Sequence, residues 1–261
     1  MSLMARFWAG RVLGMTQPRH FAGSAVAGLL LAGCAWWRST PTPLVTEVFA
    51  AEDGSESAYV LLLPGRGDRP GDYERAGFPR VLTTAGFPGE IVAADAHLQY
   101  YLKRIAIARL HEDVIAPRFP RKPWVVGISM GGLGALLYEK EHPGEAQGLV
   151  LLAPFVGDKD LIREIVAAGG IASWNPGAIA PDDWQRELWA WIKSGGLARV
   201  PVFLAWGSSD GFAEGDALLS SLVPAERVVV ISGGHTWSTW KPAFAELVRR
   251  GACGVTPAND D

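Results

Sequence analysis

The 261-residue sequence has only two cysteines, Cys34 and Cys253, and its charge is close to balanced. Two cysteines exclude a disulfide scaffold and a cysteine-based zinc site. The formal net charge is −3 and no basic stripe is present, which argues against nucleic acid as a main partner. Because 49% of the residues are apolar, disorder is excluded for most of the chain, and one α/β domain of ordinary size is expected.

The first 33 residues are predicted to be a secretory signal. Residues 1–20 contain three arginines and no acidic side chain, and an apolar run rich in Ala, Gly and Leu follows from Phe21 to Ala35. A positive start, an apolar middle and small residues at the end are typical of such a signal. The run is shorter than the roughly 20 residues that a membrane-spanning helix needs.

The apolar run ends in Leu31-Ala32-Gly33-Cys34, which resembles the lipobox of bacterial lipoproteins. The resemblance implies cleavage before Cys34 and acylation of that cysteine, which would hold a soluble domain at a bilayer. It also implies the bacterial cell envelope, facing the periplasm, and Ala35 favours the outer membrane. Residues 34–43 are then a short tether. The alternatives are an uncleaved membrane helix and an ordinary signal peptide, in which Cys34 has no role.

Residues 44–250 alternate between short apolar segments and amphipathic ones. Strands are predicted at 58–63, 89–94, 124–128, 147–153, 200–206 and 227–231, and helices at 73–85, 100–115, 130–140 and 241–250. This alternation predicts an α/β fold, with a mostly parallel central sheet flanked by helices. A further strand at 44–51 and the turn signal Asp53-Gly54 predict an N-terminal hairpin with the strand at 58–63. Residues 251–261 are expected to be a flexible tail.

Residues 155–199 interrupt the alternation and are too long for a plain connection. They contain four tryptophans, with glycine pairs at the joints. We expect a small helical insertion resembling a lid. Its tryptophans are predicted either to cover an apolar acyl pocket or simply to pack the insertion against the sheet.

One motif carries chemistry directly. Residues 127–131 match G-x-S-x-G, with Ser129 between a buried strand and a helix that begins with small residues. A serine on so sharp a turn needs glycines on both sides, because side chains there would clash with the strand and the helix. The backbone N–H of Met130, at the helix start, is expected to face developing negative charge. The alternative is an ordinary Gly-rich turn.

A serine hydroxyl needs a base, and the base needs an acid to orient it. His235 follows the last strand within Gly-Gly-His, at the edge where the loops after parallel strands meet. Asp210 follows the preceding strand, and the order Ser129, Asp210, His235 fits this class. The rival carboxylates are Asp158, Asp160 and Asp216, and the remaining histidines are His20, His97, His111 and His142.

The loop Pro64-Gly65-Arg66-Gly67 follows the first buried strand at the same edge. The Arg66 N–H is therefore a candidate second donor to an oxyanion, the alternative being an ordinary turn. With this loop, Ser129, Asp210 and His235 resemble the α/β-hydrolase superfamily over residues 44–250. Many members have His-Gly where this chain has Pro64-Gly65.

The resemblance implies a carboxylesterase-like serine hydrolase that cleaves ester or thioester bonds through an acyl-serine intermediate. The chemistry requires no cofactor, and no residue is assigned as a metal ligand. The predicted partners are a small acyl ester substrate and, through Cys34, a membrane, whereas no oligomeric state is predicted. The alternatives are a non-catalytic envelope lipoprotein with this fold, and a haloperoxidase or peptidase of the same superfamily.

Overall fold

The computed structural model describes residues 38–49 and 59–255, in which seven strands form one sheet. The spatial order is β1-β3-β2-β4-β5-β6-β7. The bounds are β1 Thr46–Phe49, β2 Tyr59–Leu63, β3 Glu90–Ala94, β4 Pro123–Ile128, β5 Gly148–Leu152, β6 Val202–Gly207 and β7 Val228–Ile231. Every neighbouring pair is parallel except β1 with β3. The predicted mostly parallel sheet is confirmed.

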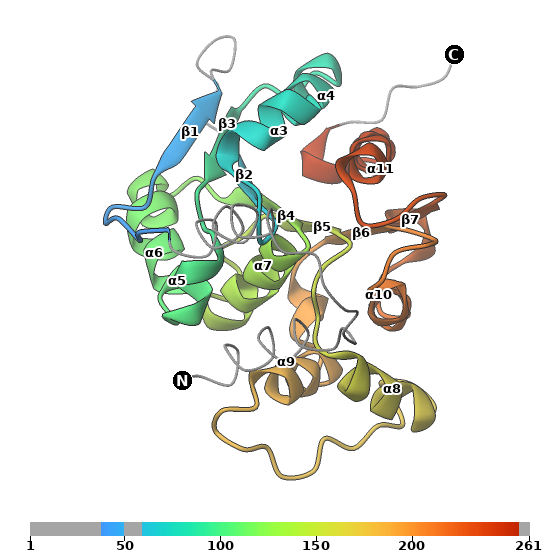
Figure 1. Ribbon diagram of the computed structural model, residues 1–261. Helices are drawn as coiled ribbons and strands as arrows, with labels where there is room; N and C mark the ends of the chain where they lie inside the picture. Colours follow the sequence, from blue (N-terminus) through green and yellow to red (C-terminus); the bar gives the residue numbers. More distant parts are fainter. Residues whose placement is uncertain (1–37, 50–58, 256–261) are drawn as a thin grey trace, which may run out of the picture.

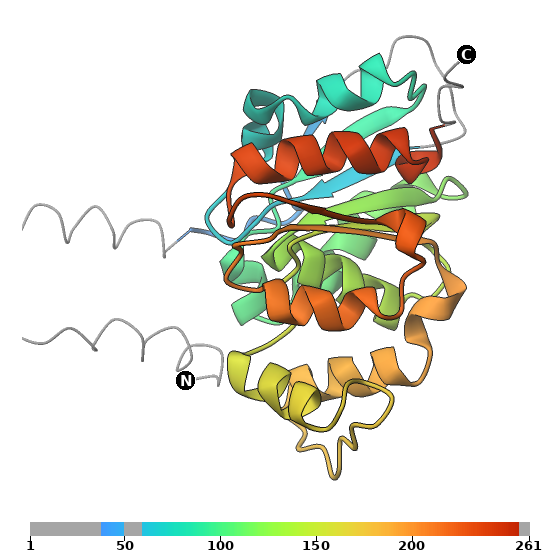
Figure 2. The same cartoon turned by 90° about the vertical axis from the view of Figure 1, so that its right-hand side faces the viewer.

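Helices cover both faces of this sheet (Figures 1 and 2). One face carries α3 Pro70–Ala76, α4 Phe78–Thr84 and α11 Trp237–Arg249. The other carries α5 Leu98–Leu102, α6 Ala106–Leu110, α7 Met130–Glu141 and α10 Ala213–Ser220. All residues of β2, β4, β5 and β6 are buried, as expected for parallel strands covered on both sides. These four strands form the centre of the core.

The predicted N-terminal hairpin is wrong. β1 pairs antiparallel with β3, with Val48 opposite Val92, and β3 lies between β1 and β2. The apolar strand β2 has parallel partners on both sides, β3 and β4, so no edge of it remains for β1. The partly exposed sequence of β1 suits a sheet edge instead. The predicted turn at Asp53-Gly54 lies outside the described residues.

Two helices predicted as continuous are broken. The segment predicted at 73–85 forms α3 and α4, which are separated by Gly77 at φ 80°. The segment predicted at 100–115 forms α5, α6 and a π-helical turn, η1 His111–Ile115, with a break at Arg104, whose φ is 58°. Positive φ values end a right-handed helix, and apolar periodicity does not report them.

The insertion at 155–199 consists of α8 Lys159–Ala167, a long loop, α9 Trp184–Lys193 and a 3-10 turn, η3 Gly196–Arg199. Its two helices are joined by Glu164, which accepts hydrogen bonds from Arg186 at 2.6 and 2.7 Å and from the Trp174 indole at 2.8 Å. These hydrogen bonds hold the pKa of Glu164 down at about 2. Trp174 and Trp189 are buried, so these two tryptophans pack the insertion.

Both ends of the described chain lie against the domain. The side chains of His97, Tyr100 and Lys103 bond to residues 39–41 of the predicted tether. Residues 251–255 include a 3-10 turn, η5 Ala252–Gly254, and pack onto the domain. Cys253 is buried there, which raises the pKa of its thiol. In the described part of the chain no helix is both long and apolar enough to cross a membrane.

Candidate active site

Ser129 lies on a strained turn between the carboxyl end of β4 and the first residue of α7. Its φ of 52° and ψ of −112° are values that residues other than glycine rarely adopt. Its N–H donates to the Leu152 carbonyl at 2.9 Å, and its own carbonyl accepts from the Phe155 N–H at 2.9 Å. The neighbouring strand β5 and the loop after it therefore hold the strained residue in place.

The glycines on either side of Ser129 are required by close backbone contacts. A Cβ on Gly127 would overlap the carbonyl of Gly131, and a Cβ on Gly131 would overlap the carbonyl oxygen of Leu63 at the end of β2. Both obstacles are backbone atoms, which cannot move aside as a flexible side chain can. The predicted reason for the G-x-S-x-G spacing, close approach of strand and helix, is what the structure shows.

Three predicted side chains meet at the carboxyl edge of the sheet. The Nε2 atom of His235 lies 2.9 Å from the Ser129 hydroxyl, and its Nδ1 lies 2.8 Å from Asp210 Oδ2. Asp210 comes from the loop after β6, and His235 from the loop between β7 and α11. The Asp210 side chain is fully buried, whereas the imidazole is 29% exposed. The His235 side of the site is thus partly exposed to solvent, whereas the Asp210 side is not.

The loops that carry the acid and the base are bonded to each other. The Ser209 N–H donates to the Gly233 carbonyl at 2.9 Å, and the Ser208 N–H donates to the Ile231 carbonyl at 2.8 Å. The second carboxylate oxygen of Asp210 accepts the Phe212 N–H at 2.9 Å. These bonds fix the carboxylate and the imidazole relative to one another before any substrate binds.

Two aromatic rings that the sequence analysis did not single out hold the imidazole. Phe212 and Trp240 each contact His235 edge to face, with ring centroids 5.0 and 4.9 Å away. Trp240 lies on α11, one helical turn beyond the histidine loop. Sequence spacing alone predicts neither contact, because one ring comes from the acid loop and the other from the last helix.

The rival carboxylates have other partners or none. Asp158 accepts from the Gln185 side chain at 3.0 Å, and Asp160 is an exposed partner of Arg163. Asp216 is fully buried on α10, and neither of its carboxylate oxygens has a hydrogen-bond partner among the described residues. Burial, together with the nearby charge of Asp210, raises the pKa of Asp216 well above its usual range. Of these carboxylates, only Asp210 bonds to His235.

The other described histidines lie elsewhere. His97 caps α5 by accepting the Gln99 N–H and bonds to the Ser39 carbonyl. His111 and His142 stack on each other at the far end of α7. His20 lies outside the described residues, as does Cys34.

The loop predicted to supply the second oxyanion donor is tied to the base loop. The Asp68 N–H donates to the Gly65 carbonyl at 3.2 Å, which closes the turn around Arg66. Asp68 Oδ1 accepts the indole N–H of Trp237 at 3.2 Å, and Trp237 stands two residues after His235. Burial raises the pKa of the Asp68 carboxyl. The hydrogen bond between Asp68 and Trp237 therefore links these two loops, and the sequence analysis did not predict it.

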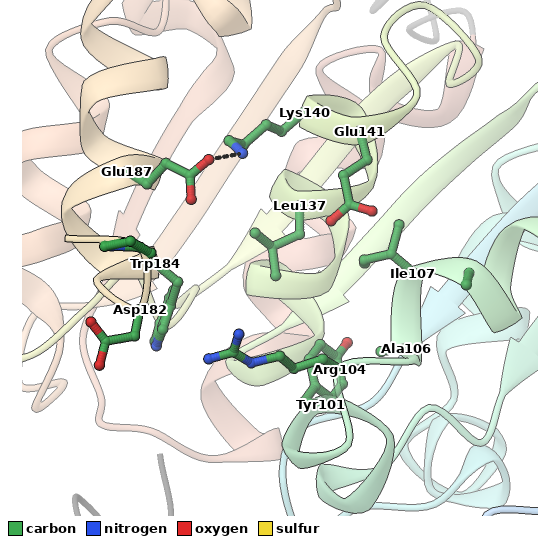
Figure 3. Close-up of a pocket in the computed structure, with 12 residues that line it drawn as sticks. Tyr101, Arg104, Ala106, Ile107, Leu137, Lys140, Glu141, Asp182, Trp184 and Glu187 are labelled. Carbon is green, nitrogen blue, oxygen red and sulfur yellow. Dashed lines mark hydrogen bonds and ion pairs between the residues drawn. The ribbon is translucent and has the colours of Figure 1, made fainter. Parts of the chain in front are cut away.

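A small cavity of about 30 Å³ lies at Ser129. Its lining includes Ser129, both predicted oxyanion residues and three aromatic side chains: Arg66, Met130, Tyr101, Phe155 and Phe212. A larger cavity of about 260 Å³ lies between α6, α7 and the insertion helix α9, with Ile107, Leu137 and Trp184 around it (Figure 3). Tyr101 lines both cavities.

Residues 106–188 match the sequence model of a family described as serine aminopeptidase, S33, a span that includes Ser129 but not Asp210 or His235. No curated protein matches the sequence.

Solved structures resemble the whole domain. A ferulic acid esterase is 13% identical, with a TM-score of 0.53 over 82% of this chain and 98% of that one. Est1E from Butyrivibrio proteoclasticus is 15% identical, with a TM-score of 0.56 over 78% and 93%. S-formylglutathione hydrolase FrmB from Staphylococcus aureus is 15% identical, with a TM-score of 0.53 over 80% and 92%. The chain has the α/β-hydrolase fold, as the sequence analysis predicted.

Proposed function

We propose that this protein is a serine hydrolase that cleaves carboxylic ester or thioester bonds through an acyl-serine intermediate. The observation that carries the proposal is the unbroken chain of hydrogen bonds from Asp210 through His235 to the hydroxyl of the strained Ser129. Nucleophile, base and orienting acid within hydrogen-bond reach are what this chemistry requires. The fold shared with the ferulic acid esterase and Est1E supports the same class.

In the proposed reaction, Ser129 Oγ attacks the substrate carbonyl carbon as His235 Nε2 takes the hydroxyl proton. The carbonyl electron pair moves onto oxygen, and the backbone N–H groups of Met130 and Arg66 stabilise that oxyanion. When the intermediate collapses, the bond to the alcohol or thiol leaving group breaks, and His235 returns the proton to it. Water then attacks the acyl-enzyme by the same route, releasing the acid and restoring Ser129.

Asp210 has two functions in this scheme. Its carboxylate accepts a hydrogen bond from the Nδ1–H group, so that Nε2 faces Ser129 with a free electron pair. It also stabilises the imidazolium that forms after proton transfer. Since the Asp210 side chain is fully buried, this interaction is poorly screened by water.

The test is a substrate panel on the purified full chain. We expect saturable hydrolysis of p-nitrophenyl esters with short acyl groups, and its loss in Ser129→Ala. The match of residues 106–188 to serine aminopeptidases favours peptide hydrolysis as the second candidate, so aminoacyl-p-nitroanilides form the other arm. Peptide cleavage without ester cleavage would replace the proposal with the second candidate. Halide oxidation, or no turnover by folded protein, would overturn both.

Tyr101, which lines both cavities, leads to a prediction on chain length. The cavity at Ser129, of about 30 Å³, is small beside the neighbouring one of about 260 Å³, and we expect Tyr101→Leu to open a connection between them. We expect the ratio of kcat/KM for an octanoate ester to that for an acetate ester to rise at least about tenfold, since several methylenes would pack on the apolar part of the larger cavity, around Ile107, Leu137 and Trp184. Tyr101→Phe keeps the ring and is the matched control. An unchanged ratio in Tyr101→Leu would show that Tyr101 does not limit chain length.

We further propose that acylated Cys34 anchors the enzyme in the bacterial envelope, as the lipobox-like segment implies. Cys34→Ser should move the protein from the membrane to the soluble fraction after cell fractionation, because the acyl chains provide the apolar attachment. Cys253→Ser is the control and should leave the distribution unchanged. Continued sedimentation of Cys34→Ser with the bilayer would indicate another anchor.

A further inference from the structure

A cluster of metal-ligand side chains lies at the end of α7 opposite Ser129. His142 follows the last residue of α7, thirteen positions after Ser129, which places the cluster roughly 20 Å from the nucleophile along the helix. His111 begins the π-helical turn η1, and Glu145 lies in the turn after α7. One ligand atom from each of these three residues lies within 4.8 Å of the others. None of the three lines the cavity at Ser129.

The two distances from the Glu145 carboxylate to the imidazoles are close to those of a small metal site. With bonds of about 2.1 Å, the donor atoms of a tetrahedral zinc site are roughly 3.4 Å apart. Glu145 Oε2 lies 3.2 Å from His111 Nδ1 and 3.8 Å from His142 Nδ1, so the two distances fall on either side of that value. The imidazoles are stacked, with centroids 4.2 Å apart and an angle of 6° between the rings. Because the in-plane lone pairs of two parallel rings do not converge, at least one of the imidazoles must turn out of the stack to bind the same ion as the other.

The donor set selects the class of ion. Two imidazoles and one carboxylate suit zinc and other first-row transition-metal dications, whereas calcium and magnesium prefer oxygen ligands alone. All three side chains are between one quarter and one third exposed, which leaves room for a water as the fourth ligand. Tyr138 donates its hydroxyl to Glu145 Oε2 at 2.7 Å and would orient that carboxylate from outside the ligand set. The same hydroxyl lies 3.1 Å from His111 Nδ1, a contact that an ion bound at Nδ1 would replace.

A buried carboxyl group lies close to the cluster. Glu139, on the last turn of α7, is fully buried and interacts electrostatically with Glu145. Its Oε1 accepts the Gly144 N–H at 3.1 Å, while its Oε2 has no hydrogen-bond partner in the described part of the chain. Burial raises the pKa of Glu139, although the charges of Lys122 and Arg199 act in the opposite direction. A nearby dication would stabilise the ionised carboxylate.

The backbone at His111 is a second, independent indication. Residues His111–Ile115 form a π-helical turn, a rare conformation that occurs often at functional sites. This turn continues α6 and brings His111 against the rings of Tyr138 and His142. We propose that His111, His142 and Glu145 form a binding site for a divalent transition-metal ion, with zinc as the reference ion. The bound ion joins η1 to the end of α7 and stabilises both.

The test uses the full chain without a histidine tag, freed of metal and titrated with zinc chloride. We expect wild type to bind one zinc more per chain than His111→Ala/His142→Ala, and Glu145→Gln to bind at least about a hundredfold more weakly. Free zinc at about a hundred times its Kd should raise the Tm of wild type by roughly 5–10 °C and leave that of the double variant unchanged. Visible absorption of bound Co²⁺ should be lost in the same variants.

His235→Gln is the matched control, because it removes an imidazole far from the cluster and should keep full zinc binding. Glu145→Gln makes the least change in shape, so it tests the site even if the double variant folds poorly. The proposal is overturned if wild type shows no saturable zinc binding, or if zinc stoichiometry and the Tm shift persist in Glu145→Gln and the double variant. Neither result depends on ester hydrolysis, so it leaves the proposed function unaffected.

Discussion

Asp210→Asn is expected to lower kcat for the best p-nitrophenyl ester by about 10³–10⁴-fold while leaving the protein folded. The amide is nearly isosteric, so the hydrogen bond from the Phe212 N–H to the remaining oxygen can persist. At His235 Nδ1, however, an amide NH₂ favours the wrong tautomer and gives the imidazolium no charge partner. The measurement is kcat by steady-state kinetics, with circular dichroism and thermal unfolding as checks on the fold.

Three matched asparagine variants distinguish Asp210 from its rivals. Asp158→Asn and Asp160→Asn should retain activity within about threefold, because their partners are Gln185 and Arg163 rather than His235. Asp216→Asn should also cost little, since neither oxygen of that carboxyl has a hydrogen-bond partner among the described residues and neither bonds to His235. A fall in kcat of several orders of magnitude in Asp158→Asn, with Asp210→Asn still active, would mean that Asp158 and not Asp210 orients His235.

The largest effect is expected from removing the nucleophile and the base. Ser129→Ala and His235→Ala should each lower kcat by about 10⁵–10⁶-fold, and the double variant should lose no more than about tenfold beyond that. The reason is that each side chain acts only through the other across the 2.9 Å hydrogen bond. The residual rate enhancement comes from substrate binding and from the oxyanion donors.

Comparing the double variant with the two single variants tests whether Ser129 and His235 act as one catalytic unit. Kinetics on Ser129→Ala, His235→Ala and the double variant must use highly purified protein, because traces of wild type would mask losses of this size. Effects that add in free energy would contradict a single catalytic unit, because they would mean that Ser129 and His235 act in separate steps.

Much of the site could be predicted because its determinants are local in sequence. The glycines around Ser129 indicate a sharp turn, and the apolar segments along the chain indicate buried parallel strands. Loops that follow parallel strands share one edge of the sheet, so Asp210 and His235 could be placed near Ser129 without coordinates. The order of the strands then brought the three residues within hydrogen-bond distance.

The failures have a common physical cause, which is that nonlocal contacts decide them. The turn signal at Asp53-Gly54 favoured a hairpin, but β2 is paired on both sides by β3 and β4. The hydrogen bond between Asp68 and Trp237 joins residues 169 positions apart, and no local sequence pattern predicts it. Likewise, apolar periodicity over 100–115 is the same whether or not the helix breaks at Arg104.

The most direct test of the account is labelling with a fluorophosphonate probe followed by mass spectrometry. The probe phosphorus reacts only with a hydroxyl whose proton a neighbouring base removes. We predict one phosphonyl group per chain, on the peptide that contains Ser129, and none in Ser129→Ala or His235→Ala. Well-folded wild-type protein that stays unlabelled, or that carries the label at another residue, would contradict the proposed role of Ser129.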